Sequence, residues 1–321
     1  MTNRRDVLKG TAAAGLAAAA APAFAQGARP MQDPQSKFTS EPFKEQPQKW
    51  PGLQREMTPV PDCGETSYQG SGRLSGRKAL VTGGDSGIGR AAAIAFSREG
   101  ADIAINYFPS EEPDAQDVAK LLRGEGRKVV LIPGDLTEEK FCVKLIAEAN
   151  KQLGGLDILV NNAAYQQSKA SIAEISSEQF DRTMKTNVYA TFWLSKAAVP
   201  LMKPGASIIN TASVNSFNPG EELLDYATTK GAIEIFTKGL AKQLAKQGIR
   251  VNAVAPGPVW TPLQIAGGQL PGKLGEFGQD TPLGRAGQPA ELASLYVTLV
   301  DPATSFTTGS VFGANGGTGS V

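Results

Sequence analysis

The chain of 321 residues contains no histidine. Imidazole carries protons near neutral pH in Ser-His-Asp and Cys-His nucleophile systems, and it is the commonest ligand of catalytic zinc. These kinds of site are therefore excluded. Any proton transfer must use Tyr, Lys, Asp, Glu, Ser or water.

An excess of charge of one sign is also missing. The chain has 32 basic and 31 acidic side chains, which gives a formal net charge of +1. Binding to nucleic acid or to anionic lipid needs clustered Lys and Arg, so neither partner is indicated. The length and the 41% hydrophobic content fit one large domain or two small ones with an ordinary packed core.

Cysteine is scarce, since Cys63 and Cys142 are the only two. Cys142 lies in a helical pattern with Phe141 and Leu145, whereas Cys63 lies in a proline-rich segment. An exported chain could pair them, but we expect two unrelated thiols. The chain is not a disulfide scaffold.

Residues 1–25 have the features of an export signal. A pair of basic residues, Arg4 and Arg5, precedes an Ala-rich stretch that is too short to span a bilayer, and an Ala-x-Ala site follows at Ala23 and Ala25. The paired arginines resemble the twin-arginine class, which exports folded proteins. We therefore expect a periplasmic or otherwise exported protein with no membrane partner after cleavage; the alternative is an Ala-rich terminal helix.

Residues 26–73 show neither a helical nor a strand period. They are rich in Pro, Gln, Glu and Ser, with isolated aromatic residues at Phe38, Phe43, Trp50 and Tyr68. A polar segment without its own core stays disordered or lies along a folded body. We expect an extended N-terminal arm that its aromatic side chains hold against the domain.

From about residue 74 to the C-terminus, short β-branched runs alternate with longer amphipathic ones. We expect strands around 79–81, 103–105, 129–132, 158–160, 207–210, 251–254 and 310–312, and helices around 91–99, 138–153, 178–202 and 226–247. Apolar strands separated by helices indicate a parallel sheet covered on both faces. The prediction is a single doubly wound (Rossmann) α/β domain with a seven-stranded parallel sheet.

A glycine-rich turn follows the first expected strand directly. Its sequence is Thr82-Gly83-Gly84-Asp85-Ser86-Gly87-Ile88-Gly89. Gly83 permits the tight turn, Gly87 lets the backbone approach a pyrophosphate, and Gly89 lets the helix pack close to the strand. The helix N-terminus then faces the phosphate charge. A glycine triplet alone is weak evidence, but its place between a strand and a helix predicts a dinucleotide site.

The spacing Thr-Gly-x-x-x-Gly-x-Gly resembles that of the short-chain dehydrogenase/reductase family, and other segments match from about Leu74 to the C-terminus. These are Gly134-Asp135-Leu136, Asn161-Asn162-Ala163-Ala164 and Pro256-Gly257-Pro258-Val259-Trp260-Thr261. Ala164 departs from the glycine of the family motif. The resemblance implies cofactor contacts from Gly83, Asp85, Ser86, Gly87, Ile88, Gly89, Asn106, Tyr107, Asp135, Leu136, Asn162, Ala163, Tyr226, Lys230, Pro256, Gly257, Val259 and Thr261.

The preferred cofactor depends on the end of the second strand. An acidic residue there would hold the ribose 2′-hydroxyl of NAD, and a nearby Arg would favour the 2′-phosphate of NADP. Asn106 and Tyr107 occupy this place, and Asp85 adds an opposing negative charge. We expect NADP to be preferred, with NAD also possible.

A tyrosine and a lysine lie four residues apart on one helical face, at Tyr226 and Lys230. A positive charge held near a phenol favours its ionised form, so the pair is the best proton-transfer device in a chain without histidine. Ser213 closes the fifth strand 13 residues earlier, at the sheet edge where ligands bind. Asn187 is expected in the middle of a helix.

These four residues match the Asn-Ser-Tyr-Lys tetrad of the family. The resemblance implies that Tyr226 exchanges a proton with the substrate oxygen and that Ser213 hydrogen-bonds the same oxygen. It also implies that Lys230 lowers the tyrosine pKa and binds the nicotinamide ribose, and that Asn187 supports a water that relays the proton.

The arm at residues 57–62 and 70–72, together with the glycine-rich turn, resembles the glucose and ribitol dehydrogenase-like aldehyde reductases. The resemblance implies a small aldehyde, ketone or polyol as substrate, a substrate-covering loop at 263–283, and a homotetramer. Two alternatives stay open. One is a catalytically silent NAD(P)-binding protein; the other is a sugar-nucleotide epimerase or dehydratase, which the glycine spacing disfavours.

Overall fold

The computed structural model describes residues 31–319. The chain divides into two compact units, Met1–Asp33 and Pro34–Val321, and the second unit holds every element described below. The expected signal peptide at residues 1–25, with its cleavage site, lies outside the described residues.

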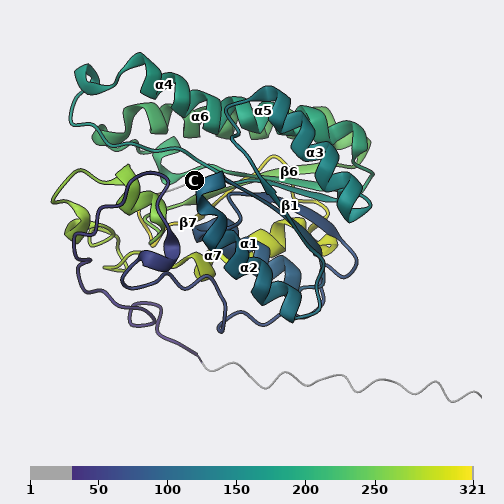
Figure 1. Ribbon diagram of the computed structural model, residues 1–321, viewed down its shortest axis with the longest axis horizontal. Coiled ribbons are helices and arrows are strands. Elements are labelled where there is room, and N and C mark those ends of the chain that lie inside the picture. Colours follow the sequence, from purple (N-terminus) through teal and green to yellow (C-terminus); the bar gives the residue numbers. More distant parts are fainter. Residues whose placement is uncertain (1–30, 320–321) are drawn as a thin grey trace, which may run out of the picture. The chain divides into compact units, whose positions relative to one another are not determined.

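The second unit is built on one parallel sheet (Figure 1). Its strands are β1 (Lys78–Thr82), β2 (Asp102–Tyr107), β3 (Val129–Pro133), β4 (Ile158–Asn161), β5 (Ser207–Thr211), β6 (Arg250–Pro256) and β7 (Val311–Ala314). The seven strands lie in the order β3-β2-β1-β4-β5-β6-β7, and every neighbouring pair is parallel. The strand order reverses between β1 and β4, the point at which such sheets bind ligands. The predicted Rossmann fold is confirmed.

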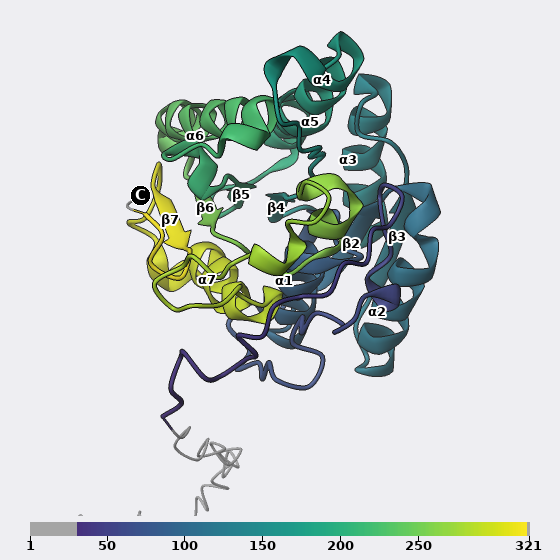
Figure 2. The ribbon, with the colours of Figure 1, turned by 90° about the vertical axis from the view of Figure 1, so that its left-hand side faces the viewer.

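Helices cover both faces of the sheet, as Figure 2 shows. One face carries α1 (Gly87–Arg98), α2 (Glu112–Gly124) and α7 (Pro289–Val300), and the other carries α3 (Glu139–Leu153), α4 (Ser177–Met184), α5 (Ala190–Ala198) and α6 (Leu224–Leu244). Each set buries an apolar stripe in its own core cluster between helices and sheet. Within residues 31–319, no helix is long and apolar enough to cross a bilayer.

Three features of the helices differ from the sequence prediction. Helix α2 was missed, because Pro113 and a polar first turn hide its buried face. Helix α7 was missed because most of its side chains are buried and apolar, so it has little period. The single helix expected over 178–202 is interrupted by a π-helical turn at Lys185–Tyr189, which carries Asn187.

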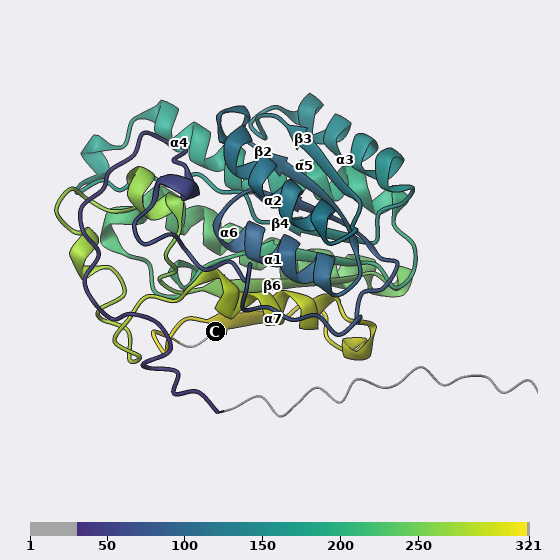
Figure 3. The same ribbon diagram turned by 60° about the horizontal axis from the view of Figure 1, so that its bottom comes forward.

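Within the second unit, residues 34–73 of the arm pack against the Rossmann fold through aromatic rings and hydrogen bonds; Figure 3 shows this part of the arm in purple. The rings of Phe43 and Trp260 stack with their centroids 3.8 Å apart. The Tyr68 hydroxyl donates to Glu99 at 2.7 Å. Cys63 and Cys142 are buried, free and unpaired, as expected from the sequence.

Candidate active site

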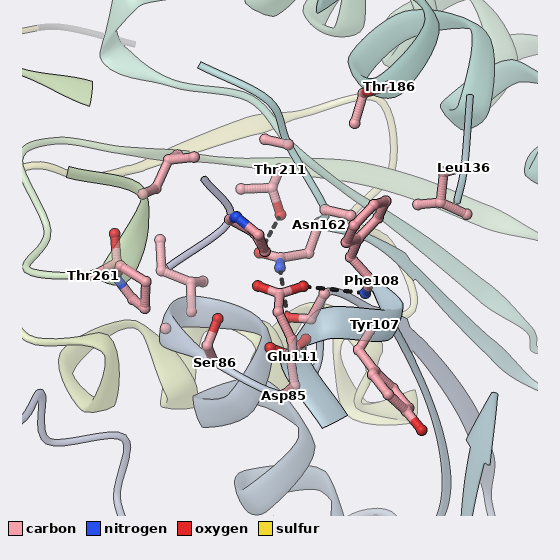
Figure 4. Close-up of a pocket in the computed structure, with 18 of the residues that line it drawn as sticks. Asp85, Ser86, Tyr107, Phe108, Glu111, Leu136, Asn162, Thr186, Thr211 and Thr261 are labelled. Atoms are coloured by element: carbon pink, nitrogen blue, oxygen red, sulfur yellow. Dashed lines mark hydrogen bonds between the residues drawn. The ribbon is translucent and has the colours of Figure 1, made fainter. Parts of the chain in front are cut away.

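A pocket opens at the carboxyl ends of the strands around the reversal of strand order, and Figure 4 shows part of its lining. With one exception, every residue predicted to contact the cofactor lines this pocket. The exception is Gly89, which packs behind the pocket: a Cβ there would lie 1.9 Å from the Gly83 carbonyl oxygen. As predicted, its role is to let the helix pack closely against the strand.

The glycine-rich turn fits a dinucleotide pyrophosphate. Gly83 and Gly87 have φ angles of +60° and +51°, a backbone region that favours glycine. Helix α1 begins at Gly87 and directs its N-terminus at the pocket, where its backbone dipoles favour a phosphate. The arm supports this turn, because the Gly87 N–H donates to the side chain of Gln54 at 2.7 Å.

Ser213, Tyr226 and Lys230 meet on one wall of the pocket. Ser213 follows β5, and the other two lie on the first turns of α6. All three side chains are at most 8% exposed. The Ser213 Oγ accepts hydrogen bonds from Asn215, so its own hydrogen is left for the Tyr226 hydroxyl or for a substrate oxygen.

Burial shifts the pKa values of the two titratable side chains on this wall. It raises the pKa of Tyr226 to about 12, against a smaller lowering by hydrogen bonding to Ser213. It lowers the pKa of Lys230 to about 7. The Lys230 Nζ lies 5.2 Å from the Tyr226 ring centroid and donates to the Thr211 carbonyl at 2.7 Å. Burial outweighs the lowering of the tyrosine pKa expected from Lys230, so Tyr226 favours its uncharged form, whereas Lys230 is about half charged near pH 7.

Asn187 lies beside this wall and not in it. Its amide donates to the Tyr165 carbonyl and to the Thr229 hydroxyl, both at 3.0 Å, and its Oδ1 accepts from the Tyr165 N–H at 2.8 Å. Both amide hydrogens are thus used within the protein. The side chain therefore links the loop after β4 to Thr229 on α6. Thr229 lies between Tyr226 and Lys230 in the sequence.

The pocket also contains residues that the sequence did not indicate, notably Trp50, Phe108, Glu111 and Arg182. The ring of Trp50 meets that of Phe108 edge-on, with centroids 4.8 Å apart. Trp50 comes from the irregular arm, where a lone aromatic residue gives no signal of its partner. Glu111 stands in a run of acidic residues that reads as a solvated turn.

A second hollow adjoins the first at Ser213 and Tyr226. Its other walls mix apolar residues with many polar side chains. They include Gln166, Asn215, Asn218, Glu222, Gln264, Gln269, Lys273 and Asp280. Several of these belong to the segment 263–283, which was expected to cover the substrate.

Comparisons with known proteins agree with this geometry. Residues 83–319 match the family model described as enoyl-(acyl carrier protein) reductase. The chain is 57% identical over 287 residues to an uncharacterized oxidoreductase, YghA, of Escherichia coli, covering 89% of this chain and 98% of that protein. It is 44% identical over 273 residues to NADPH-dependent aldehyde reductase 1, chloroplastic, of Arabidopsis thaliana, covering 83% of this chain and 94% of that protein.

A solved structure shares the fold. It is a short-chain dehydrogenase from Burkholderia cenocepacia in complex with NADP, 32% identical with a TM-score of 0.72, covering 76% of this chain and 98% of that one. The chain therefore belongs to the short-chain dehydrogenase/reductase family of nicotinamide-dependent oxidoreductases.

Proposed function

We propose that this protein interconverts a small aldehyde or ketone with its alcohol, or oxidises a polyol, using NADP in preference to NAD. The observation that carries this proposal is the meeting of Ser213, Tyr226 and Lys230 on the wall of a pocket that also contains the glycine-rich turn. The aldehyde reductase and the NADP complex among the similar proteins support the choice of substrate class and cofactor.

The lining residues divide the pocket into places for the parts of a dinucleotide. The glycine-rich turn and the N-terminus of α1 would hold the pyrophosphate, and Asp135 with Leu136 would hold the adenine. Lys230 would hold the nicotinamide ribose, while Val259 and Thr261 would hold the nicotinamide amide. When bound, the dinucleotide supplies or accepts the hydride at the substrate carbon.

The buried side chains of Tyr226 and Ser213 then act on the substrate oxygen. In the reductive direction Tyr226 donates its phenolic proton to the carbonyl oxygen, and in the oxidative direction it takes the proton back. Burial keeps Tyr226 protonated, which suits it to reduction. Ser213 donates a hydrogen bond to the same oxygen and stabilises the charge that develops there.

Asn187 belongs to the same proposal as a support for the proton route. Its side chain fixes the Tyr165 backbone and Thr229, and Thr229 lies between the two acid-base residues on α6. A water held beside this junction would connect Lys230 with solvent.

The polar side chains of the second hollow support a hydroxylated substrate, because their amide and charged groups can exchange hydrogen bonds with several hydroxyl groups. A panel of aldehydes, ketones and polyols assayed with NADPH, NADH and their oxidised forms tests the proposal. Turnover of at least one carbonyl or alcohol is expected. The second candidate is a cofactor-binding protein without catalysis, and single-turnover failure of the cofactor-loaded protein across the whole panel would favour it.

We also propose export through the twin-arginine route and assembly into a homotetramer. Residues 1–25 support the first, and fractionation with N-terminal sequencing of the mature protein tests it. Exposed apolar side chains on and beside α5 and α6, including Tyr189, Phe192, Leu224 and Ile235, support the second. Light scattering at several concentrations tests it.

A further inference from the structure

Two carboxyl groups face the pocket at the ends of β1 and β2. Asp85 lies in the glycine-rich turn after β1, and Glu111 closes the short 3-10 turn Pro109–Glu111 after β2. Figure 4 shows both side chains in the lining, with the Phe108 N–H donating to the Glu111 Oε2 at 3.1 Å. No sequence motif indicated Glu111 as part of a site.

The Asp85 carboxyl has an unusual environment. Its residue is 0% exposed, and neither carboxylate oxygen has a well-formed hydrogen bond among the described residues; burial raises its pKa more than its own N–H and the Ser86 hydroxyl lower it. Such a group is costly in its ionised form. It lines the pocket, but both oxygens are shielded from solvent, so Asp85 acts on a bound ligand through its charge, and the contact itself falls to Glu111.

The basic residues of the pocket lining do not pair with the two carboxyls. Arg182 lies over the ring of Trp50, with its Nε left without a hydrogen-bond partner among the described residues, and Lys230 donates to a backbone carbonyl. On α1, Arg90 attracts Asp85 but is paired with Glu65 at 2.7 Å.

The remaining titratable groups around the pair are acidic or neutral. Asp114 on α2 adds negative charge, and its oxygens accept from the Gln54 and Arg55 N–H groups. On β2, the Tyr107 hydroxyl donates to Glu112 at 2.5 Å. The pair therefore meets its ligand with little help from a positive charge.

The place of the pair determines which part of the dinucleotide it meets. In a doubly wound fold, the ribose of the adenosine lies where the turn after β1 approaches the end of β2, and its 2′ substituent distinguishes NAD from NADP. A 2′-hydroxyl can donate to a carboxylate. A 2′-phosphate is an anion with acceptor oxygens, and it requires a hydrogen-bond donor instead.

A protonated carboxyl is such a donor. Burial raises the pKa of Asp85 to about 7. Burial, and after it the charge of Asp85, raises the pKa of Glu111 to about 9. Two buried carboxyls that face one space resist ionising together, so the pair holds at least one proton near neutral pH.

We propose that the Asp85–Glu111 pair reads the 2′ position of the cofactor through its own protonation, so that NADPH binding takes up a proton at the pair and NADH binding does not. This inference rests on the proposed nicotinamide chemistry of the pocket. A dianionic phosphate raises the proton affinity of the carboxyls beside it. NADPH affinity is consequently full while the free pair is protonated and falls as the pH rises and the pair ionises.

The test compares dissociation constants for NADPH and NADH at pH 7, 8 and 9 and constant ionic strength, from the fluorescence of the bound nucleotide. Above pH 7 the free 2′-phosphate, whose second pKa is about 6, is already a dianion. Any further pH dependence therefore belongs to the protein. We expect the NADPH dissociation constant to rise toward about tenfold per pH unit, the limit for one proton, and that of NADH to change less than about threefold.

Calorimetry provides a readout that needs no substitution. NADPH titrations in two buffers of different ionisation enthalpy should report net proton uptake near pH 8, and NADH titrations should report none. Parallel weakening of both nucleotides with pH, or equal proton uptake by both, would overturn the proposal.

Variants assign the effect to the pair. Asp85→Asn should flatten the pH dependence and tighten NADPH binding at pH 8.5 by about tenfold, since a neutral group replaces a carboxylate that is ionised at that pH. Glu111→Gln is the second variant and should act in the same direction but by less, because Glu111 is still largely protonated there. Asp117→Asn removes the same charge from an exposed position on α2 and is the matched control. An equal response to Asp117→Asn would contradict a local role for the pair, and failure of every form to bind either nucleotide would refute the proposed function itself.

Discussion

The guanidinium of Arg182 lies 4.2 Å from the centroid of the Trp50 ring. Trp50 belongs to the N-terminal arm and Arg182 to α4, and both line the cofactor pocket. A cation over the face of an indole ring is attracted to it, and more strongly when water is excluded. The contact joins the arm to α4 within the pocket lining.

Trp50→Ala should therefore release the cofactor faster. Loss of the ring removes the Arg182 contact and the edge-on contact with Phe108, which together are worth about 1–2 kcal/mol. We expect the dissociation rate of NADPH, measured by stopped-flow displacement, to rise by about 5- to 30-fold. Phe38→Ala removes an arm ring outside the pocket and should leave the rate unchanged; an equal effect of both would show only that the arm has loosened.

Tyr226→Phe isolates the proton-transfer role. The substitution removes one hydroxyl from a buried ring, so the fold and the affinity for NADPH should persist. Turnover should fall by about 10²–10⁴-fold, the usual contribution of a general acid. The measurement is kcat beside the NADPH dissociation constant, with the exposed Tyr189→Phe as control. Residual activity above about a tenth of wild type would contradict the assignment.

The two directions of the reaction should respond differently to pH. Because burial raises the pKa of Tyr226 to about 12, the phenol that reduction needs predominates at all lower pH values, whereas the phenolate that oxidation needs is scarce. We expect alcohol oxidation to rise steadily between pH 7 and 10, while reduction at saturating cofactor stays nearly flat to pH 9. Steady-state pH profiles of kcat test this, and an oxidation rate that levels off near pH 7 would show that the bound cofactor lowers the tyrosine pKa strongly.

Gly89→Ala tests the glycine-rich turn without altering any of the side chains that line the pocket. The new Cβ would lie 1.9 Å from the Gly83 carbonyl oxygen, so the turn must move. We expect at least about a tenfold loss of affinity for NADPH and a destabilisation of about 1–3 kcal/mol, as for other overpacked sites. Gly231→Ala is the matched control in α6, because nothing lies within 4 Å of its Cβ. It should stabilise the protein by about 0.5–1 kcal/mol.

The predictable residues of the site are those that lie in short patterns of the sequence. The glycine-rich turn and the spacing of Tyr226 and Lys230 each lie within a few residues of the chain, and the element around them sets their geometry. The strands were predictable for the same reason, because a short apolar β-branched run between two helices rarely forms anything other than a buried strand.

The pocket residues that the sequence did not indicate reach the site through contacts between distant segments. Trp50 reaches the pocket only because the arm is held by residues such as Trp260, about 200 positions later. Glu111 enters it because the turn after β2 folds back toward the glycine-rich turn. Neither residue sits in a periodic pattern, so nothing nearby in the sequence distinguishes them from solvated positions.

The contacts that hold the arm also set an order of assembly. The Asp62 N–H donates to the Gln288 side chain at 3.0 Å, and the Ala290 N–H donates to the Asp62 carbonyl at 2.9 Å. Arg73 pairs with Asp301 at 2.5 Å. Contacts between residues so far apart in sequence form late in folding, since the intervening loop must close first. The arm leaves the ribosome before the Rossmann domain, yet it finds its place after that domain, and the part of the pocket lining that Trp50 supplies is in place only when nearly the whole chain has been made.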